Sequence, residues 1–452
     1  MNETNNKYNN SSFRDPSGYI IEENDKIFRI ILPSYFEIYN YLKNTNFFDK
    51  FIEKRLLIPH KEIEANKNNI IIQAEKVPFL SFPYEWSFSQ LKSAAILTLK
   101  IQYESIKQGI TLKDASAYNI QFIGKNPIFI DTTSFELYKE GQPWTAYKQF
   151  CEHFLAPLLL MKHRDTKFSK ILSNYIDGIP LLLTSKTLPF KTYFNSLCLL
   201  HIHSHSKKIK KYENNFSALK QSAFIPKHKL LNIIEHLYEQ IEKLNIDNKS
   251  NWNDYYKNCS YNEKAITEKV NFVKNSINNT TPGYILDIGC NEGFFSNVVK
   301  NKSSYIIAID NDDLVIERLY NNLNSDDNIL PLIVDITNPS PSIGWENKER
   351  ISFIKRIGTN NTTIALALIH HLRIFYNIPL ENIAKFFAKF SKQLIIEFVP
   401  KTDVQTQKLL QNKADTYNDY TEENFVLCFT KYFTITEISH NNGRILYNMN
   451  RK

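Results

Sequence analysis

A chain of 452 residues, 42% of them apolar and 13% aromatic, is long enough for two or three domains with buried cores. Its formal net charge of +8 comes from lysines spread along the sequence. The one local run, at Lys207, Lys208, Lys210 and Lys211, lacks the interleaved arginine and aromatic residues of a nucleic-acid surface, which argues against a nucleic-acid partner.

The pattern of cysteines and the lengths of the apolar runs indicate the cellular compartment of the protein. Five cysteines form no CxxC pair, and the polar, Asn-rich start of the chain contains no apolar signal core. No apolar run approaches the length of a membrane span. We therefore expect a protein of the reducing cytoplasm with no membrane span.

The first part of the chain predicts a mixed α+β domain over residues 13–225, preceded by a disordered tail at 1–12. Two alternating runs at 14–21 and 26–31 predict a hairpin, and a helix is expected at about 34–43. Ser87 is the expected cap of a long amphipathic helix that Gly109 ends.

Three polar residues follow that helix in a pattern with possible metal chemistry. Asp114 and Asn119 lie in a loop before a short strand, and a turn at Gly124 leads to a second strand that ends in Asp131. An asparagine and an aspartate on adjacent elements can hold magnesium through oxygen, and Asp114 would face a hydroxyl group.

This segment resembles the catalytic segment of the protein-kinase-like fold. Asp114 matches the catalytic aspartate, Asn119 the metal-binding asparagine and Asp131 the metal aspartate of that fold. The resemblance implies a kinase-like domain with Mg-ATP as its ligand. The chain departs from the pattern in having no Gly-x-Gly-x-x-Gly in its first hairpin and Thr132-Thr133 in place of Phe-Gly, so a scaffold without turnover is the alternative.

Residues 144–245 are expected to be mostly helical, with helices at 144–162, 189–204 and 227–245. His201, His203 and His205 alternate near the end of the second of these. On a helix, residues two apart do not face one another, so a zinc site is the weaker interpretation there.

The stretch 284–296 predicts a strand, a tight glycine turn and a helix. A largely apolar run ends at Gly289 and Gly293, which allow a sharp turn and a close backbone approach to a ligand because neither has a Cβ. Asp287 is near the end of the strand, and Asn291 stands between the two glycines, where asparagine tolerates a positive φ.

The motif Asp287-Ile-Gly-Cys-Asn-Glu-Gly293 resembles motif I of the class I S-adenosylmethionine-dependent methyltransferases, with Asn291 in place of the usual middle glycine. The resemblance implies that S-adenosyl-L-methionine binds at Asp287, Gly289, Cys290, Asn291 and Gly293. An ordinary strand-to-helix turn or another nucleotide-binding domain is the alternative.

The following strands support this resemblance, because they end in polar residues. The second strand, 304–309, is followed by Asp310, about 20 residues past the turn, where an acidic side chain can meet ribose hydroxyls. The third, 329–334, is followed by Asp335 and Ile336, which the resemblance places at the adenine. Helices are expected at 312–322, 346–357 and 379–390.

The last strands complete the expected sheet. Strands at 363–368 and 393–398 are followed by two runs joined by Asn441-Asn442-Gly443, a strong hairpin signal. For residues 263–452 we therefore predict an α/β, Rossmann-like seven-stranded methyltransferase sheet with a terminal antiparallel hairpin. Residues 226–262 would be a helical connector and substrate-pocket cover, with Tyr255, Tyr256 and Tyr261 as pocket walls or as aromatic packing at a domain junction.

Catalytic candidates lie at the ends of the fourth and fifth strands. His370 and His371 follow the fourth strand, and a histidine there can take a proton near neutral pH. We expect one of them in the site and the other in packing. Glu397 is a second candidate base or orienting residue, and no metal is expected in this domain.

The acceptor predicted from these features is a small molecule or a glycan, since the fourth strand lacks the Asn/Asp-Pro-Pro-Tyr/Phe signature of nucleic-acid amino methylation. Two alternatives stay open. One is a bifunctional protein with a magnesium-ATP-dependent phosphotransferase in the N-terminal domain, and the other is a non-catalytic cofactor-binding scaffold.

Overall fold

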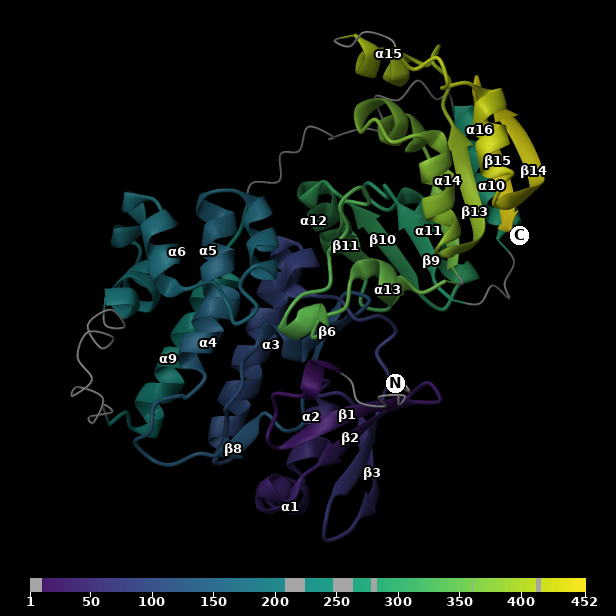
Figure 1. Cartoon of the computed structure of the whole chain (residues 1–452). Helices are drawn as coiled ribbons and strands as arrows, with labels where there is room; N and C mark the ends of the chain where they lie inside the picture. Colours follow the sequence, from purple (N-terminus) through teal and green to yellow (C-terminus); the bar gives the residue numbers. More distant parts are fainter. Residues whose placement is uncertain (1–9, 208–223, 247–262, 278–282, 360, 412–415) are drawn as a thin grey trace. The chain divides into compact units, whose positions relative to one another are not determined.

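The computed structural model describes residues 10–207, 224–246, 263–277, 283–359, 361–411 and 416–452. The chain divides into two compact units (Figure 1), of which unit 1 is Met1–Asp247 with Ser342–Ile351 and unit 2 is Asn248–Pro341 with Ser352–Lys452. The predicted pocket walls Tyr255, Tyr256 and Tyr261 lie outside the described residues. Across the described ranges, no helix is long and apolar enough to cross a membrane.

Unit 1 begins with a four-stranded antiparallel sheet in the order β1-β2-β4-β3. Its strands are β1 (Gly18–Glu23), β2 (Lys26–Ile31), β3 (His60–Ala65) and β4 (Ile70–Ala74). The predicted hairpin is confirmed, and Asn24 and Asp25 close it with positive φ angles of 51° and 62°, as a tight hairpin turn requires. Residues 10–12, predicted as part of a disordered tail, instead form a 3-10 turn in which Ser12 Oγ accepts the N–H of Ile20 at 2.9 Å.

Short helices and the long helix α3 complete the first half of unit 1. The helices are α1 (Phe36–Asn44), α2 (Phe47–Glu53) and α3 (Phe88–Lys107). Ser87 caps α3 as predicted, because its side chain accepts the N–H of Gln90 while the Gln90 side chain accepts the N–H of Ser87. Two hairpin-like pairs follow, β5 (Ile110–Leu112) with β8 (Phe135–Leu137), and β6 (Ile120–Ile123) with β7 (Asn126–Phe129).

The rest of unit 1 is helical, and the helix predicted at 144–162 runs without a break from Tyr147 to His163 through α4, η5 and α5. The helical elements are α4 (Tyr147–Phe150), η5 (Cys151–Leu155), α5 (Ala156–His163), η6 (Thr166–Ser173), α6 (Leu181–Thr187), η7 (Phe190–Phe194), α7 (Ser196–Cys198), η8 (Leu199–His203) and α9 (Lys227–Glu242). The helix expected at 189–204 is broken at Asn195, which is extended and caps α7 by accepting the N–H of Cys198.

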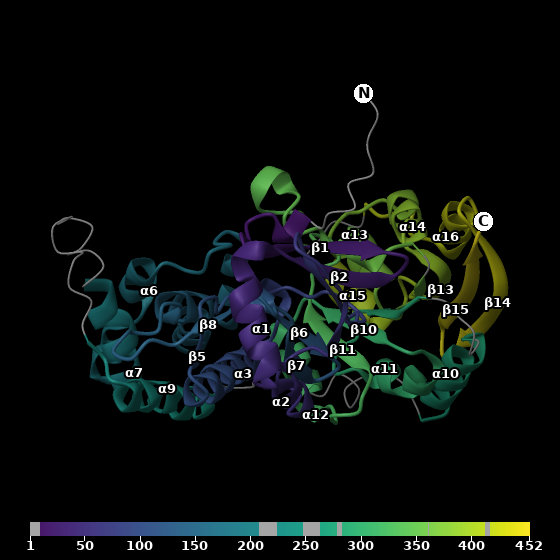
Figure 2. The same ribbon diagram turned by 90° about the horizontal axis from the view of Figure 1, so that it is seen from below.

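Helix α9 belongs to unit 1, although the sequence suggested that residues 226–262 connect two domains. Its buried residues Leu230, Ile234, Leu237 and Ile241 recur at helical spacing. This stripe is the reason that α9 packs along α3 (Figure 2).

Unit 2 is built on a seven-stranded sheet in the order β11-β10-β9-β12-β13-β15-β14. Its strands are β9 (Ile285–Ile288), β10 (Ile306–Asp310), β11 (Ile329–Ile333), β12 (Asn361–Ala365), β13 (Ser391–Phe398), β14 (Phe433–Asn441) and β15 (Arg444–Arg451). The first five strands are parallel and the hairpin β14–β15 is antiparallel, as predicted. The order reverses between β9 and β12, and open α/β sheets bind ligands at such a point.

The helices of unit 2 connect these strands. They are α10 (Glu263–Ser276), α11 (Phe294–Val299), α12 (Asp313–Asn322), α13 (Phe353–Ile357), the π-helical turn η12 (His371–Phe375), α14 (Leu380–Ala388), α15 (Val404–Leu410) and α16 (Glu422–Phe429). A core of buried residues from α10, α11, α12 and the parallel strands, including Phe272, Val299 and Ile316, fixes the carboxyl edge of the sheet.

The helix predicted at 346–357 is wrong over its first half. Gly344, Glu346 and Asn347 have positive φ angles of 82°, 53° and 56°, which end any right-handed helix there. The helix α13 begins only after Ser352, whose side chain accepts the N–H of Lys355. The segment that precedes α13, Ser342–Ile351, belongs to unit 1.

Candidate functional site

The glycine turn after β9 has the left-handed backbone that its sequence predicts. Gly289, Asn291 and Gly293 have φ angles of 73°, 51° and 76°. The turn is fastened to the neighbouring strand, because the N–H groups of Gly289 and Cys290 both donate to the carbonyl of Ile309, at 2.9 and 3.1 Å. These two hydrogen bonds fix the position of the turn relative to the carboxyl ends of β9 and β10.

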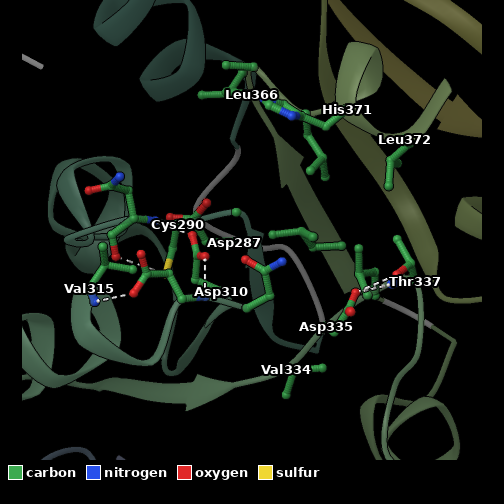
Figure 3. A pocket seen from close by; sticks show the side chains of 18 of the residues that line it. Asp287, Cys290, Asp310, Val315, Val334, Asp335, Thr337, Leu366, His371 and Leu372 are labelled. Atoms are coloured by element: carbon green, nitrogen blue, oxygen red, sulfur yellow. Dashed lines mark hydrogen bonds between the residues drawn. The ribbon is translucent and has the colours of Figure 1, made fainter. Parts of the chain in front are cut away.

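Three carboxylates surround a cavity of about 430 Å³ at this edge of the sheet. Asp287 is on β9, Asp310 ends β10 and Asp335 follows β11, so they come from three adjacent strands. Figure 3 shows Asp287 and Asp310 close to Cys290, with Asp335 and Thr337 on another side of the cavity. The sequence prediction that acidic strand ends meet at one edge is therefore confirmed in its geometry.

Of the predicted binding residues, seven line this cavity: Asp287, Gly289, Cys290, Asn291, Asp310, Asp335 and Ile336. Gly293 is not among the lining residues. A Cβ at Gly293 would lie 2.4 Å from Cδ1 of Leu319, so this glycine lets α12 approach the turn. The Cys290 side chain is buried, and burial raises the pKa of its thiol well above the usual value.

Asp310 joins the turn to the sheet. Its Oδ2 accepts the N–H of Asn291 and its Oδ1 accepts the N–H of Asp312, both at 3.0 Å. Burial raises its pKa above the ordinary value. Asp335 is held more simply, because Oδ1 accepts both the N–H and the hydroxyl of Thr337, at 2.9 and 2.6 Å. Each carboxylate thus has a fixed orientation and further lone pairs for a ligand.

Asp287 is buried and has one short hydrogen bond, from the hydroxyl of Ser296 to its Oδ2 at 2.6 Å. Burial raises the pKa of Asp287 to about 6, with a smaller rise from Asp310. The carboxyl group is therefore charged in the folded protein only above this pH. The desolvation of that charge opposes folding at neutral pH.

We expect Asp287→Asn to become more stable relative to the natural protein as the pH rises from 4 to 7. A raised carboxyl pKa means that the native state binds the proton more tightly than the unfolded state does. The protonated carboxyl group therefore contributes stability that is fully present below the unfolded pKa and is lost as pH rises through the folded pKa. A pKa of about 6 against an ordinary 3.8 corresponds to about 3 kcal/mol. Urea unfolding at pH 4, 5, 6 and 7 measures the difference.

The control for this experiment is Asp326→Asn, since Asp326 is exposed on the loop after α12. Urea unfolding of Asp326→Asn at the same pH values shows how much the loss of an exposed aspartate changes the free energy of unfolding. If the difference in the free energy of unfolding between Asp287→Asn and the natural protein stays constant from pH 4 to 7, Asp287 is charged at all of these pH values.

The two histidines divide as expected, one in the cavity and one in packing. His371 lines the cavity, and burial lowers its pKa to about 4. His370 is fully buried behind it, with ring centroids 4.3 Å apart, and neither of its ring nitrogens has a hydrogen-bond partner in the described part of the chain. Burial, followed by the charges of His371, Arg444 and Lys269, lowers its pKa. Both rings are therefore neutral at pH 7.

Glu397, predicted as a base or an orienting residue, does not line the cavity, which favours the second of these two roles. It is fully buried on β13, and its Oε2 lies 2.8 Å from Nζ of Lys269, accepts the N–H of Ala367 at 2.7 Å and is 3.8 Å from Arg444. Lys269 and Ala367 both line the cavity, and Ala367 has a positive φ of 50°. Glu397 therefore fixes the positions of these two residues of the cavity wall.

Sequence reasoning missed several residues of the cavity wall. They include Lys269, Phe295, Leu366, Ala367, Leu368, Tyr376 and Leu409. Lys269 had a signal, because it stands one turn from Ala265 and one turn from Val273 on the buried face of α10. A lysine in such a stripe needs a buried partner, and Glu397 within the apolar run of β13 is that partner.

A second cavity, of about 540 Å³, lies in unit 1 and brings Asp114, Asn119 and Asp131 together as the sequence predicts. The contacts of the Asp131 carboxylate do not fit a magnesium ligand, because both of its oxygens already have partners. Its Oδ1 lies 2.7 Å from the guanidinium of Arg29 and accepts the N–H and hydroxyl of Thr133, while its Oδ2 accepts the hydroxyl of Ser134. Although burial raises the pKa of Asp131, Arg29 and these donors lower it below its usual value. The guanidinium thus supplies the positive charge that a metal ion would bring.

The segment Ser342–Ile351 contributes to the wall of this second cavity. Glu349 accepts a hydrogen bond from Arg14 at 3.0 Å, and the Arg350 guanidinium lies 4.5 Å from the ring centroid of Tyr118. Both residues of this segment line the cavity.

Comparison with known proteins gives one relative over nearly the whole chain and several remote structural likenesses. The chain is 32% identical over 431 residues to the nodulation protein NoeA of Rhizobium meliloti (strain 1021), covering 92% of this chain and 89% of the relative. A search of protein-family models found no match.

Among solved structures, the N-methyltransferase NodS of Bradyrhizobium japonicum WM9 in complex with S-adenosyl-L-homocysteine is 13% identical, covers 45% of this chain and 94% of its own, and has a TM-score of 0.33. The magnesium protoporphyrin IX methyltransferase ChlM of Synechocystis PCC 6803 is 16% identical, with 44% and 92% covered and a TM-score of 0.32. The bifunctional kinase-methyltransferase WbdD is 14% identical, with 41% and 39% covered and a TM-score of 0.30. TM-scores below 0.5 are too low to carry a functional inference, so the chemistry is derived from the site itself.

Proposed function

This chain belongs to the family of the nodulation protein NoeA, and we propose that it is an S-adenosylmethionine-dependent methyltransferase that acts on a small molecule or a glycan. The observation that carries the proposal is the set of three carboxylates on adjacent parallel strands beside a left-handed glycine turn. That arrangement stands at the switch point of an open sheet, where nucleotide-like ligands bind.

The residues of the cavity fit the cofactor part by part. In this proposal, Asp310 accepts hydrogen bonds from two ribose hydroxyls, and Asp335 and Ile336 contact the adenine; all three residues line the cavity. Asp287 and the backbone of Gly289 and Asn291 suit a cationic, hydrogen-bonding amino-acid end. When bound, S-adenosyl-L-methionine supplies an electrophilic methyl group on a sulfonium. The apolar side chains of Phe295, Val315, Leu366, Leu368 and Leu372 keep water from this region.

His371 is the residue that we propose as proton acceptor from the methyl acceptor. It lines the cavity, burial lowers its pKa to about 4, and a neutral imidazole can accept a proton from a hydroxyl or an amine. His370 packs behind the His371 ring and is proposed to hold it in place. Lys269, fixed by Glu397, adds a positive charge at the cavity wall.

The size of the cavity favours a small acceptor or the end of a glycan chain. About 430 Å³ is the volume of one ligand site, and its walls come from buried strand ends and from η12 and α15. Because the cofactor would fill much of this volume, we propose that only the reacting end of the acceptor, a single sugar or a small hydroxylated or amino compound, approaches His371.

We expect calorimetric titration of the full-length protein with S-adenosyl-L-homocysteine to give one site with micromolar affinity, equivalent to about −8 kcal/mol. Magnesium-ATP titrated into the same cell should give no heat, because Arg29 already occupies the charged face of Asp131. Transfer of a labelled methyl group to pools of small molecules and oligosaccharides then tests the reaction. Absence of S-adenosyl-L-homocysteine binding would contradict the methyltransferase proposal. Binding of magnesium-ATP would instead favour the bifunctional alternative.

A further inference from the structure

The helices after α5 expose an unusual group of large apolar side chains. Six of them occur within residues 182–200, on α6, η7 and η8. They are Leu182 (37% exposed), Leu183 (39%), Phe190 (75%), Phe194 (84%), Leu199 (39%) and Leu200 (55%). We call these six residues the apolar face. Single exposed apolar residues are common on proteins, but six of them on three elements that pack against one another favour an interaction surface.

The apolar face is not a frayed edge of the core, because each of its elements also has an inward side that is fully packed. Leu181, Leu188, Leu197, Cys198 and Ile202 are buried beneath it, each no more than 5% exposed. Phe190, Phe194 and Leu200 are therefore exposed outside a core that is already packed.

One buried histidine holds the three elements together. His203, at the end of η8, lies 2.8 Å from the hydroxyl of Ser185 on α6 through Nδ1 and 2.9 Å from the hydroxyl of Thr192 on η7 through Nε2. Tyr193 stacks on the same ring at a centroid distance of 3.8 Å. Both ring nitrogens of His203 are used in this way, and among the described residues no group of histidine, cysteine or acidic side chains could hold a metal ion. Of the three alternating histidines, His203 thus links α6, η7 and η8.

Lysine is the only charged residue type in the stretch that contains the apolar face. Residues 178–207 contain three lysines, at 186, 191 and 207, and no aspartate or glutamate. All three lysines are exposed. On the neighbouring helix end, the exposed Arg164 donates to the carbonyl of Thr187 at 2.6 Å and stands next to the exposed Asp165, which has the opposite charge.

We infer that the apolar face docks on a membrane surface that contains anionic lipids. Exposed phenylalanine and leucine side chains can enter the boundary between headgroups and acyl chains, while the surrounding lysines meet the negative headgroups. A second copy of the chain is a poorer occupant, because a two-fold contact would bring Lys186 and Lys191 of both copies together, and lysine is depleted in protein interfaces. The docking is peripheral and requires no spanning helix.

Co-sedimentation of the full-length protein with vesicles tests this inference. Vesicles of phosphatidylcholine with 30% phosphatidylglycerol should bind the protein, and binding should weaken as salt is raised from 50 to 500 mM, since salt screens surface charge. Pure phosphatidylcholine vesicles should bind at least tenfold less. The double variant Phe190→Glu/Phe194→Glu should lose binding, and Lys186→Glu/Lys191→Glu should bind anionic vesicles about 30-fold more weakly or worse.

The matched control is Leu427→Glu, which changes a similarly exposed leucine (62%) on α16 of unit 2 and should bind vesicles as the natural protein does. Each variant should keep its circular dichroism and its affinity for S-adenosyl-L-homocysteine, because none of these residues lines the cofactor cavity. Vesicle binding by Phe190→Glu/Phe194→Glu equal to that of the natural protein would overturn the inference. So would a dimer in light scattering that this double variant abolishes, combined with no vesicle binding, because the apolar face would then be an interface between two copies.

Discussion

Asp310→Ala is expected to weaken the binding of S-adenosyl-L-homocysteine by about a hundredfold. Under the proposed function, the Asp310 carboxylate accepts two hydroxyl hydrogens, and hydrogen bonds to a charged group contribute about 1.5–3 kcal/mol each. The substitution also frees the N–H of Asn291, which Asp310 Oδ2 accepts at 3.0 Å, so the glycine turn loses one of its fixed contacts. Calorimetric titration of both proteins at pH 7.5 gives the ratio of dissociation constants.

Two further variants separate a lost contact from a lost fold. Asp326→Ala removes an exposed carboxylate of the same unit and should leave the affinity unchanged. Asp310→Asn keeps an oxygen that can accept the N–H of Asn291 while it removes the charge, so its affinity should fall between those of the natural protein and Asp310→Ala. An Asp310→Ala protein that binds within twofold of the natural affinity would show that β10 does not hold the ribose.

Glu397→Ala should lower the free energy of unfolding by about 3–5 kcal/mol, the cost of breaking a buried ion pair by removing one partner. Glu397 and Lys269 are 1% and 6% exposed at their side chains, so the lysine would be left charged and buried. The N–H of Ala367 would lose its acceptor as well. Urea unfolding followed by fluorescence and circular dichroism measures the loss.

The double variant Lys269→Met/Glu397→Leu should recover most of that stability, because it removes both charges together. Glu381→Ala breaks an exposed pair with Lys431 and should change nothing measurable. If Glu397→Gln kept full stability and cofactor affinity but lost methyl transfer, Glu397 would be a proton acceptor and not a positioning residue.

The part of the site that follows β9, β10 and β11 could be predicted because its signals are local. Each acidic residue directly follows an apolar run, and parallel strands bring their carboxyl ends to one edge whatever the order of the sheet. The positive φ of Asn291 was predictable for the same reason, since the turn between the two glycines demands it.

The contacts that give Glu397, Asp131 and the two histidines their roles are distant in sequence. Lys269 and Glu397 are 128 residues apart, and nothing in either segment names the other. Arg29 lies in the first hairpin and reaches Asp131 only through the fold of unit 1. Which histidine faces the cavity depends on the π-helical turn that begins at His371, a feature with no clear pattern in sequence.

The wrong prediction of a helix at 346–357 shows a different limit of prediction from the sequence. The stretch has charged residues typical of an exposed helix, but Gly344, Glu346 and Asn347 adopt left-handed conformations so that Ile343 and Arg350 can pair as a short bridge. Tertiary contacts of Glu349 and Arg350 in unit 1 outweigh the weak local preference for a helix.

The membership of Ser342–Ile351 in unit 1 affects how the protein can be synthesised and divided. A growing chain that has emerged from the ribosome only as far as residue 247 has every strand of the first sheet but not Glu349, the partner of Arg14, nor Arg350, which covers Tyr118. Unit 1 is therefore completed only after β9, β10 and β11 of unit 2 have been made. The two units are therefore not synthesised one after the other, and no single cut of the chain yields either one whole.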